Sequence, residues 1–126
     1  SMVTALYTAI LAIWLIVLSF RVIALRGNPA FSFFAFGKED STSLDRAIRG
    51  HGNLTEYAPM MLLLLFFLEQ QGASAGLLHG LGGTFLLGRL MHGFCFAFMK
   101  KSMVLRIGGM VLTLTCLLLG AVLLLL

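Results

Sequence analysis

Most of this chain consists of apolar runs that are each about as long as a membrane-spanning helix. Residues 3–24 contain a single charged residue, Arg21, and residues 103–126 are mostly Leu, Val and Gly after Arg106. A helix needs about 20 apolar residues to cross a bilayer. The 126-residue chain has 11% charged residues, too few to cover a soluble domain, which takes roughly 25%. We therefore predict an integral membrane protein and exclude a large soluble enzyme, a polybasic extramembrane domain and a disordered tail.

The apolar runs predict an all-α, up-down four-helix bundle that forms one domain, residues 1–126, with helices at about 3–26, 43–70, 75–98 and 103–126. Residues 26–42 contain Gly27, Asn28 and Pro29, which predict a loop. The other connections are short, which favours antiparallel neighbours. Four phenylalanines of the first loop are expected at the membrane interface: Phe31, Phe33, Phe34 and Phe36.

The basic residues predict how the chain lies in the membrane. One side of the predicted membrane has Glu69 and no basic residue. All nine Lys and Arg residues lie at or nearer the other side: Arg21, Arg26, Lys38, Arg46, Arg49, Arg89, Lys100, Lys101 and Arg106. Because cytoplasmic loops are enriched in Lys and Arg, we expect both termini outside the cytoplasm. The first apolar run lacks a basic leader and a cleavage site, so it is expected to be a retained span and Ser1 a tag remnant.

The second predicted helix begins with a polar segment, Arg46-Ala-Ile-Arg49-Gly-His51-Gly-Asn53-Leu-Thr-Glu56-Tyr57-Ala-Pro59. At about 100° per residue, one face about 100° wide carries five polar side chains: Arg46, Arg49, Asn53, Glu56 and Tyr57. In the third helix, Arg89, His92 and Phe96 also share one face. Pro59 should bend the second helix.

These polar faces allow two interpretations. Charged side chains at hydrocarbon depth cost about 2.5–3.5 kcal/mol each, so they persist where they pair or bind something. The first interpretation is intramembrane ion pairs, Arg49 or Arg89 with Glu56, together with arginines that reach the cytoplasmic boundary. The second interpretation is that the polar faces bind an anionic ligand. It follows from the excess of basic residues, because one acid, Glu56, faces five arginines: Arg26, Arg46, Arg49, Arg89 and Arg106.

Unmatched guanidinium groups favour a small cytosolic polyanion, since they bind carboxylates and phosphates through paired hydrogen bonds. Glu56 could receive an ammonium group, and Asn53 could both donate to and accept from an amide. Glutathione carries this set of groups. A phosphorylated lipid head group is left open as an alternative ligand.

The motif resembles that of the MAPEG family (membrane-associated proteins in eicosanoid and glutathione metabolism), which includes the microsomal glutathione transferases. The resemblance rests on Arg46-x-x-Arg49-x-x-x-Asn53-x-x-Glu56-Tyr57-x-Pro59, on Arg89-x-x-His92, and on Arg106-Ile-Gly-Gly, and it covers all four helices. It implies a homotrimer in membrane lipid, with glutathione as co-substrate bound between subunits and open to the cytosol. Within the family the chain is most similar to small bacterial members, which implies the inner membrane.

The resemblance also implies roles for single residues. Arg46, Arg49, Asn53, Glu56 and Tyr57 would form the glutathione-binding face, Arg26 would reach in from the end of the first helix, and Arg89 and His92 would line the same site. Arg106 would stabilise the thiolate if a short insertion precedes it. Phe96 stands where the eicosanoid enzymes of the family have a tyrosine, so one ligand contact is missing.

The implied chemistry is attack by a glutathione thiolate on a hydrophobic small molecule that enters from the bilayer. Guanidinium groups favour a thiolate, so Arg106 is the first catalytic candidate and Arg89 the second, while His92 could supply a proton or a hydrogen bond. Transferase and peroxidase activity both stay open. The alternative is a non-catalytic lipid- or partner-binding protein on the same scaffold, and a transporter subunit ranks behind both.

The remaining candidate residues favour structural roles. His51 is expected to form a hydrogen bond between helices, and the histidines lack the spacing of a metal site. Cys95 and Cys116 lie in apolar runs, so we predict neither a disulfide nor a reactive thiol. A stripe of small residues can pack within one subunit or between subunits: Gly76, Gly80, Thr84 and Gly88. The basic residues form no soluble stripe, so we expect no nucleic-acid partner.

Overall fold

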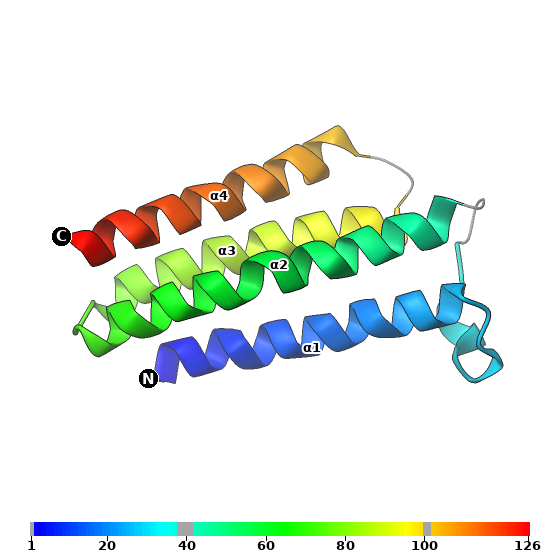
Figure 1. Cartoon of the computed structure of the whole chain (residues 1–126), viewed down its shortest axis with the longest axis horizontal. Coiled ribbons are helices and arrows are strands. Elements are labelled where there is room, and N and C mark those ends of the chain that lie inside the picture. Colours follow the sequence, from blue (N-terminus) through cyan, green and yellow to red (C-terminus); the bar gives the residue numbers. More distant parts are fainter. Residues whose placement is uncertain (1, 38–41, 100–101) are drawn as a thin grey trace.

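The computed structural model describes residues 2–37, 42–99 and 102–126 as four long helices and one short 3₁₀ helix (Figure 1). The elements are α1 (Met2–Leu25), η1 (Pro29–Phe34), α2 (Thr42–Gln70), α3 (Ala75–Phe98) and α4 (Met103–Leu125). The long helices run alternately up and down, so both termini lie at one end and η1 at the other. Their ends lie within one residue of the predicted ends. Lys38, Lys100 and Lys101, which entered the prediction of orientation, lie outside the described residues.

The α1–α2 connection differs from the predicted loop because residues 29–34 form η1. Asn28 caps this helix, accepting a hydrogen bond from the Ala30 amide at 2.9 Å, and Pro29 occupies the first turn, where a missing N–H costs nothing. Gly27 and Gly37 adopt positive φ angles on either side. The same residues that indicate a loop therefore also specify where a short helix begins.

Serine residues cap two of the long helices. Ser74 accepts a hydrogen bond from the Leu77 amide at 3.1 Å, and Ser102 accepts one from the Leu105 amide at 3.3 Å. Before Ser74, Gly72 takes a positive φ of 85°, which closes the short α2–α3 turn. Turn and cap residues thus explain why α3 and α4 begin where they do.

The beginning of α1 is capped by a side chain from another helix. Glu69, at the end of α2, accepts hydrogen bonds from the Val3 amide (3.0 Å), the Thr4 amide (2.9 Å) and the Thr4 hydroxyl (2.7 Å). The first turn of α1 has no acid of its own. A carboxylate at this position accepts hydrogen bonds from amides that have no acceptor within the helix, and its negative charge interacts favourably with the helix dipole.

Glycines allow α3 to pack closely against α4 and α1. A Cβ atom on Gly109 would lie 2.7 Å from the Gly88 carbonyl oxygen, so the α3 and α4 backbones touch there. Gly82 and Gly93 make room for Tyr7 and Trp14 of α1. Within the small-residue stripe, Gly88 therefore packs inside the subunit, whereas a Cβ on Gly76 or Gly80 would meet nothing within 4 Å.

Three helices of the described residues are long and apolar enough to span a membrane: α1, α3 and α4. α2 falls outside this group because its first half is polar, so its role as a fourth span stays a prediction. Large apolar side chains are exposed along the bundle, among them Ile13, Leu63, Val111 and Leu118. Such a surface suits contact with lipid or with other apolar helices.

Replacing Glu69 with Gln should lower the Tm of the detergent-solubilised protein by several degrees, because the amides of Val3 and Thr4 lose a charged acceptor. Thermal unfolding followed by circular dichroism measures the change. The neighbouring substitution Gln70→Ala is the matched control. Equal Tm values for wild type and Glu69→Gln would contradict the capping role.

A methyl group on Gly109 should destabilise the bundle by about 1–3 kcal/mol, because it would overlap the α3 backbone 2.7 Å away. The Gly80→Ala control, where the added Cβ meets nothing within 4 Å, should be neutral or slightly stabilising. Unfolding in detergent mixtures compares the two variants. Marked destabilisation by Gly80→Ala would instead indicate that this part of α3 packs against a second subunit.

Candidate functional site

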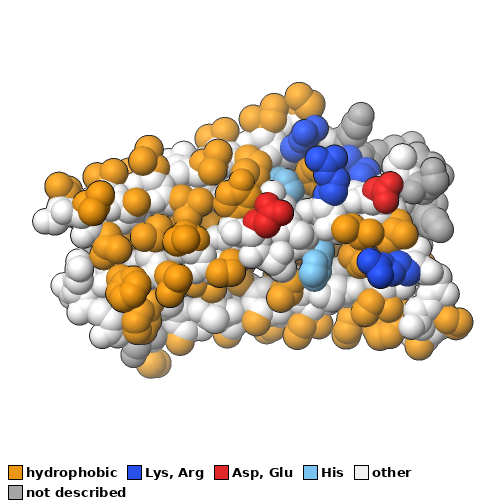
Figure 2. Space-filling model, viewed as in Figure 1, with side chains coloured by type: hydrophobic (Ala, Val, Ile, Leu, Met, Phe, Trp, Pro, Cys, Tyr) orange, Lys and Arg blue, Asp and Glu red, His pale blue; other side chains and the backbone are white. Residues whose placement is uncertain are grey.

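Polar and apolar side chains separate along the length of the bundle. In the face shown in Figure 2, charged and histidine side chains gather from the middle of the molecule toward the end that carries η1, and the opposite half of this face shows hydrophobic side chains but no charged or histidine side chain. A site for a polar ligand is therefore expected in this half of the bundle.

Phe96 of α3 forms the centre of a cluster of cations. The guanidinium carbons of Arg46, Arg49 and Arg106 lie 4.9, 6.0 and 5.8 Å from the centre of its ring. The His92 ring stacks on Phe96 at 4.6 Å between ring centres. An aromatic face attracts cations, so Phe96 holds together arginines from α2 and α4. We call these five residues the arginine cluster.

The arginine cluster is open on its outer side. Phe96 and His92 are buried, Arg46 is half-buried, and Arg49 and Arg106 are exposed in the single chain. Glu56 is exposed as well, so Arg49, Glu56 and Arg106 do not lie in the interior of the single four-helix bundle. Their donors and acceptors face outward from the bundle, where a ligand or another subunit can reach them.

Arg89 is the buried arginine of the predicted set, and the protein supplies its partners. Its Nε donates to the Thr113 hydroxyl at 2.9 Å, Nη1 donates to the Asn53 side-chain oxygen, and Nη2 contacts the Met110 sulfur at 3.2 Å. The guanidinium also lies 5.4 Å from the Tyr57 ring centre. Arg89 is therefore placed to hold Asn53 and Tyr57, and neither interpretation of the sequence included its contacts with Thr113 and Met110.

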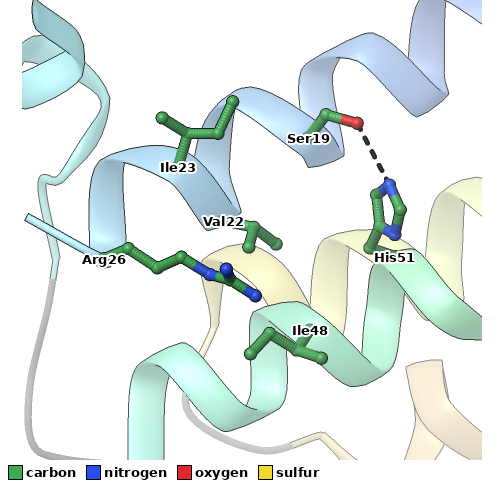
Figure 3. A pocket seen from close by; sticks show the side chains of 6 residues that line it. All are labelled: Ser19, Val22, Ile23, Arg26, Ile48 and His51. Carbon is green, nitrogen blue, oxygen red and sulfur yellow. Dashed lines mark hydrogen bonds between the residues drawn. The ribbon is translucent and has the colours of Figure 1, made fainter. Parts of the chain in front are cut away.

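The structure does not bring Arg26 to the arginine cluster within one chain. Arg26 lines a separate pocket of about 260 Å³ between α1 and α2 (Figure 3), together with Ser19, Val22, Ile23, Ile48 and His51. His51 contacts the Ser19 hydroxyl at 3.1 Å, which confirms the predicted bond between helices. Ile48 and His51 lie on the side of α2 away from Arg49 and Asn53, so Arg26 approaches α2 from the opposite side.

Two further side chains of this end have contacts that the sequence did not indicate. Arg21, whose charge interrupts the first apolar run, is 2% exposed and donates hydrogen bonds to backbone carbonyls of η1 and α3. Cys95 is buried, and its sulfur lies 3.8 Å from Nη2 of Arg46. A lone charge in an apolar helix was the available signal for Arg21, whereas nothing in the sequence pairs Cys95 with Arg46.

The described part of the chain contains no group of three or more His, Cys, Asp or Glu side chains that could hold a metal ion. The arginine cluster is instead cationic and suits a ligand with more than one negative charge. A carboxylate or phosphate could contact Arg49 and Arg106, and Glu56 offers an acceptor for a positively charged group.

Comparisons with known proteins agree with the motif. Residues 4–126 match the model of the MAPEG family. The inner membrane protein YecN of Escherichia coli K12 is 40% identical over 95 residues, which cover 75% of this chain and 70% of the relative. YecN of Escherichia coli O6:H1 strain CFT073 matches to the same extent. No solved structure matches the chain significantly.

The family match extends over nearly the whole chain and includes every residue of the arginine cluster. Together with the three apolar helices and the similarity to an inner membrane protein, it shows that this is an integral membrane protein. The chain belongs to the MAPEG family.

Proposed function

We propose that this protein binds glutathione at the arginine cluster and uses its thiolate against lipophilic electrophiles. The observation that carries the proposal is the convergence of Arg46, Arg49 and Arg106 on Phe96, with Glu56 exposed on the same face of α2. Glutathione has two carboxylates and one ammonium group, which suit the exposed guanidinium groups of Arg49 and Arg106 and the exposed carboxylate of Glu56.

The proposed mechanism depends on the acidity of the bound thiol. A free thiol has a pKa near 8.5 and is mostly protonated at neutral pH, and a nearby guanidinium lowers that pKa. We assign the stabilisation of the thiolate to Arg106. Its side chain is exposed, and its guanidinium carbon lies 5.8 Å from the centre of the Phe96 ring. Arg89 has its donors occupied by Asn53 and Thr113, so we assign it to holding Asn53 against the ligand.

Two reactions are compatible with such a thiolate. In a transferase reaction, sulfur attacks an electrophilic carbon and a C–S bond forms. The bond from that carbon to its leaving group, or to an epoxide oxygen, breaks, and its electron pair goes to the departing atom; an epoxide oxygen then takes up a proton. In a peroxidase reaction, sulfur attacks the O–O bond of a hydroperoxide and releases an alcohol, and a second glutathione then yields glutathione disulfide and water. Both reactions need an apolar substrate in the bilayer beside a ligand from the cytosol.

We further propose that the site is completed in a homotrimer in the inner membrane, with the arginine cluster on the cytoplasmic side and both termini on the other. Arg26 supports the assembly, because it approaches α2 from the side away from the arginine cluster and can meet a ligand there only from another copy of the chain. The basic residues support the orientation. The exposed apolar side chains leave surface for subunit contacts.

Phe96 favours a second candidate function, a non-catalytic lipid- or partner-binding protein. Its ring has no hydroxyl and attracts the arginines itself, so it adds no hydrogen bond to a bound thiol. Glutathione binding without thiolate formation, or without turnover of any electrophile, would favour this second candidate.

Arg106→Ala should raise the pKa of bound glutathione by about one unit, because one positive charge near the sulfur is removed. In this variant the thiolate absorbance of bound glutathione should appear at a higher pH than in wild type. The pH profile of conjugation should also shift to higher pH. Arg106→Lys, which keeps the charge, should shift it less. A wild type that fails to bind glutathione at millimolar concentration would defeat the proposed function.

Glu56→Gln should weaken glutathione binding by about tenfold, because it removes a charged partner of the ammonium group. The matched test uses N-acetylated glutathione, which has no ammonium group and should bind wild type and variant alike. Isothermal titration calorimetry measures both ligands. An equal loss of affinity for the two ligands would show that Glu56 does not bind the ammonium group of glutathione.

A further inference from the structure

The most buried charge at the polar end of α1 is Arg21, whose guanidinium lies among backbone carbonyls and aromatic rings. Nε donates to the Ala97 carbonyl at 2.8 Å, and Nη1 donates to the carbonyls of Phe34 (2.8 Å) and Phe36 (2.6 Å). The guanidinium carbon lies 5.1 Å from the Phe36 ring centre and 5.2 Å from the Phe98 ring centre. One side chain of α1 thereby connects η1 to the end of α3.

The carbonyls at the end of α3 need such donors. The last four carbonyls of a helix have no partner within it, and α3 has no basic residue in its last turn. Arg21 bonds to the Ala97 carbonyl, and Arg46 of α2 donates to the carbonyls of Cys95 (2.9 Å) and Met99 (3.4 Å). We call Arg21, Arg46 and these three carbonyls the arginine clamp.

The arginine clamp encloses the residue on which the arginine cluster is built. Phe96 lies between Cys95 and Ala97, so its backbone is held on one side by Arg46 and on the other by Arg21. A Cβ on Gly50 of α2 would lie 3.1 Å from the Phe96 Cβ, so α2 also packs tightly there. Small shifts of this segment would move the Phe96 ring relative to Arg49 and Arg106.

We propose that Arg21 is a positioning residue for the ligand site: it acts through the Ala97 carbonyl to hold Phe96 and His92 beneath the guanidinium groups of Arg49 and Arg106. Arg21 touches no ligand in this assignment. The role in ligand binding rests on the proposed function, whereas the role in holding the end of α3 does not.

The two cysteines test the arginine clamp independently of any ligand. Cys95 lies in the clamp and is 1% exposed, and Cys116 lies in the opposite half, where its thiol donates to the Leu81 carbonyl and is 2% exposed. Arg21→Gln should increase the rate of maleimide labelling of Cys95 by about tenfold, because local opening of the α3 end becomes easier. Labelling of Cys116, resolved by peptide mass spectrometry, should stay unchanged.

Parallel increases at Cys95 and Cys116 would show general destabilisation, and unchanged labelling at both would show that Arg21 holds nothing; either result overturns the proposal. Phe36→Leu is the second variant if Arg21→Gln does not fold. It removes one aromatic face from Arg21 at a side chain that is 57% exposed, and should raise Cys95 labelling by a smaller factor. Arg26→Gln, the other arginine of this end of the chain, is the labelling control.

Glutathione titration tests the second half of the proposal. Arg21→Gln should weaken binding by about tenfold under conditions in which it is fully folded. Glu69→Gln, which loses a cap at the far end of the bundle, should bind as wild type does, and so separates positioning from stability. Wild-type affinity in Arg21→Gln would refute the positioning role. Absence of binding by wild type would refute the proposed function and leave the labelling result to decide on the clamp.

Discussion

The bundle depends on how it satisfies guanidinium groups inside an apolar protein. In a membrane no water is available to buried donors, so the protein must supply their partners. Arg21 and Arg89, each 2% exposed, solve this problem differently. Arg21 uses carbonyls at helix ends and aromatic rings, and Arg89 uses the side chains of Asn53, Thr113 and Met110. The two arginines therefore join elements that are far apart in the sequence.

The helices were predictable because their signals are local. Ser74, Ser102 and Gly72 specify helix ends within a few residues of themselves, and the spacing in α2 places its polar side chains on one face. That face indicates which side of α2 carries the site, but it does not indicate that Arg49 and Arg106 meet at the ring of Phe96. Contacts between distant segments could not be predicted in this way. No periodic pattern in the sequence indicates which carbonyls bind Arg21, or that Glu69 caps α1.

The separation of Arg26 from the arginine cluster illustrates a second limit of sequence reasoning. A resemblance can name the residues of a site without saying which chain each comes from. In the single chain, Arg26 lies beside His51 on one side of α2 and the arginine cluster lies on the other. Family membership and this geometry are compatible if neighbouring subunits share the site, as the proposed homotrimer would allow.

The cap from Glu69 has a consequence for biogenesis. The amides of Val3 and Thr4 receive their acceptor from a residue that is synthesised more than sixty positions later. While α1 emerges alone from the ribosome, its first turn lacks this partner, and it acquires the partner when the end of α2 arrives beside it. The smallest segment of the nascent chain with a satisfied beginning is thus the α1–α2 hairpin rather than the first helix.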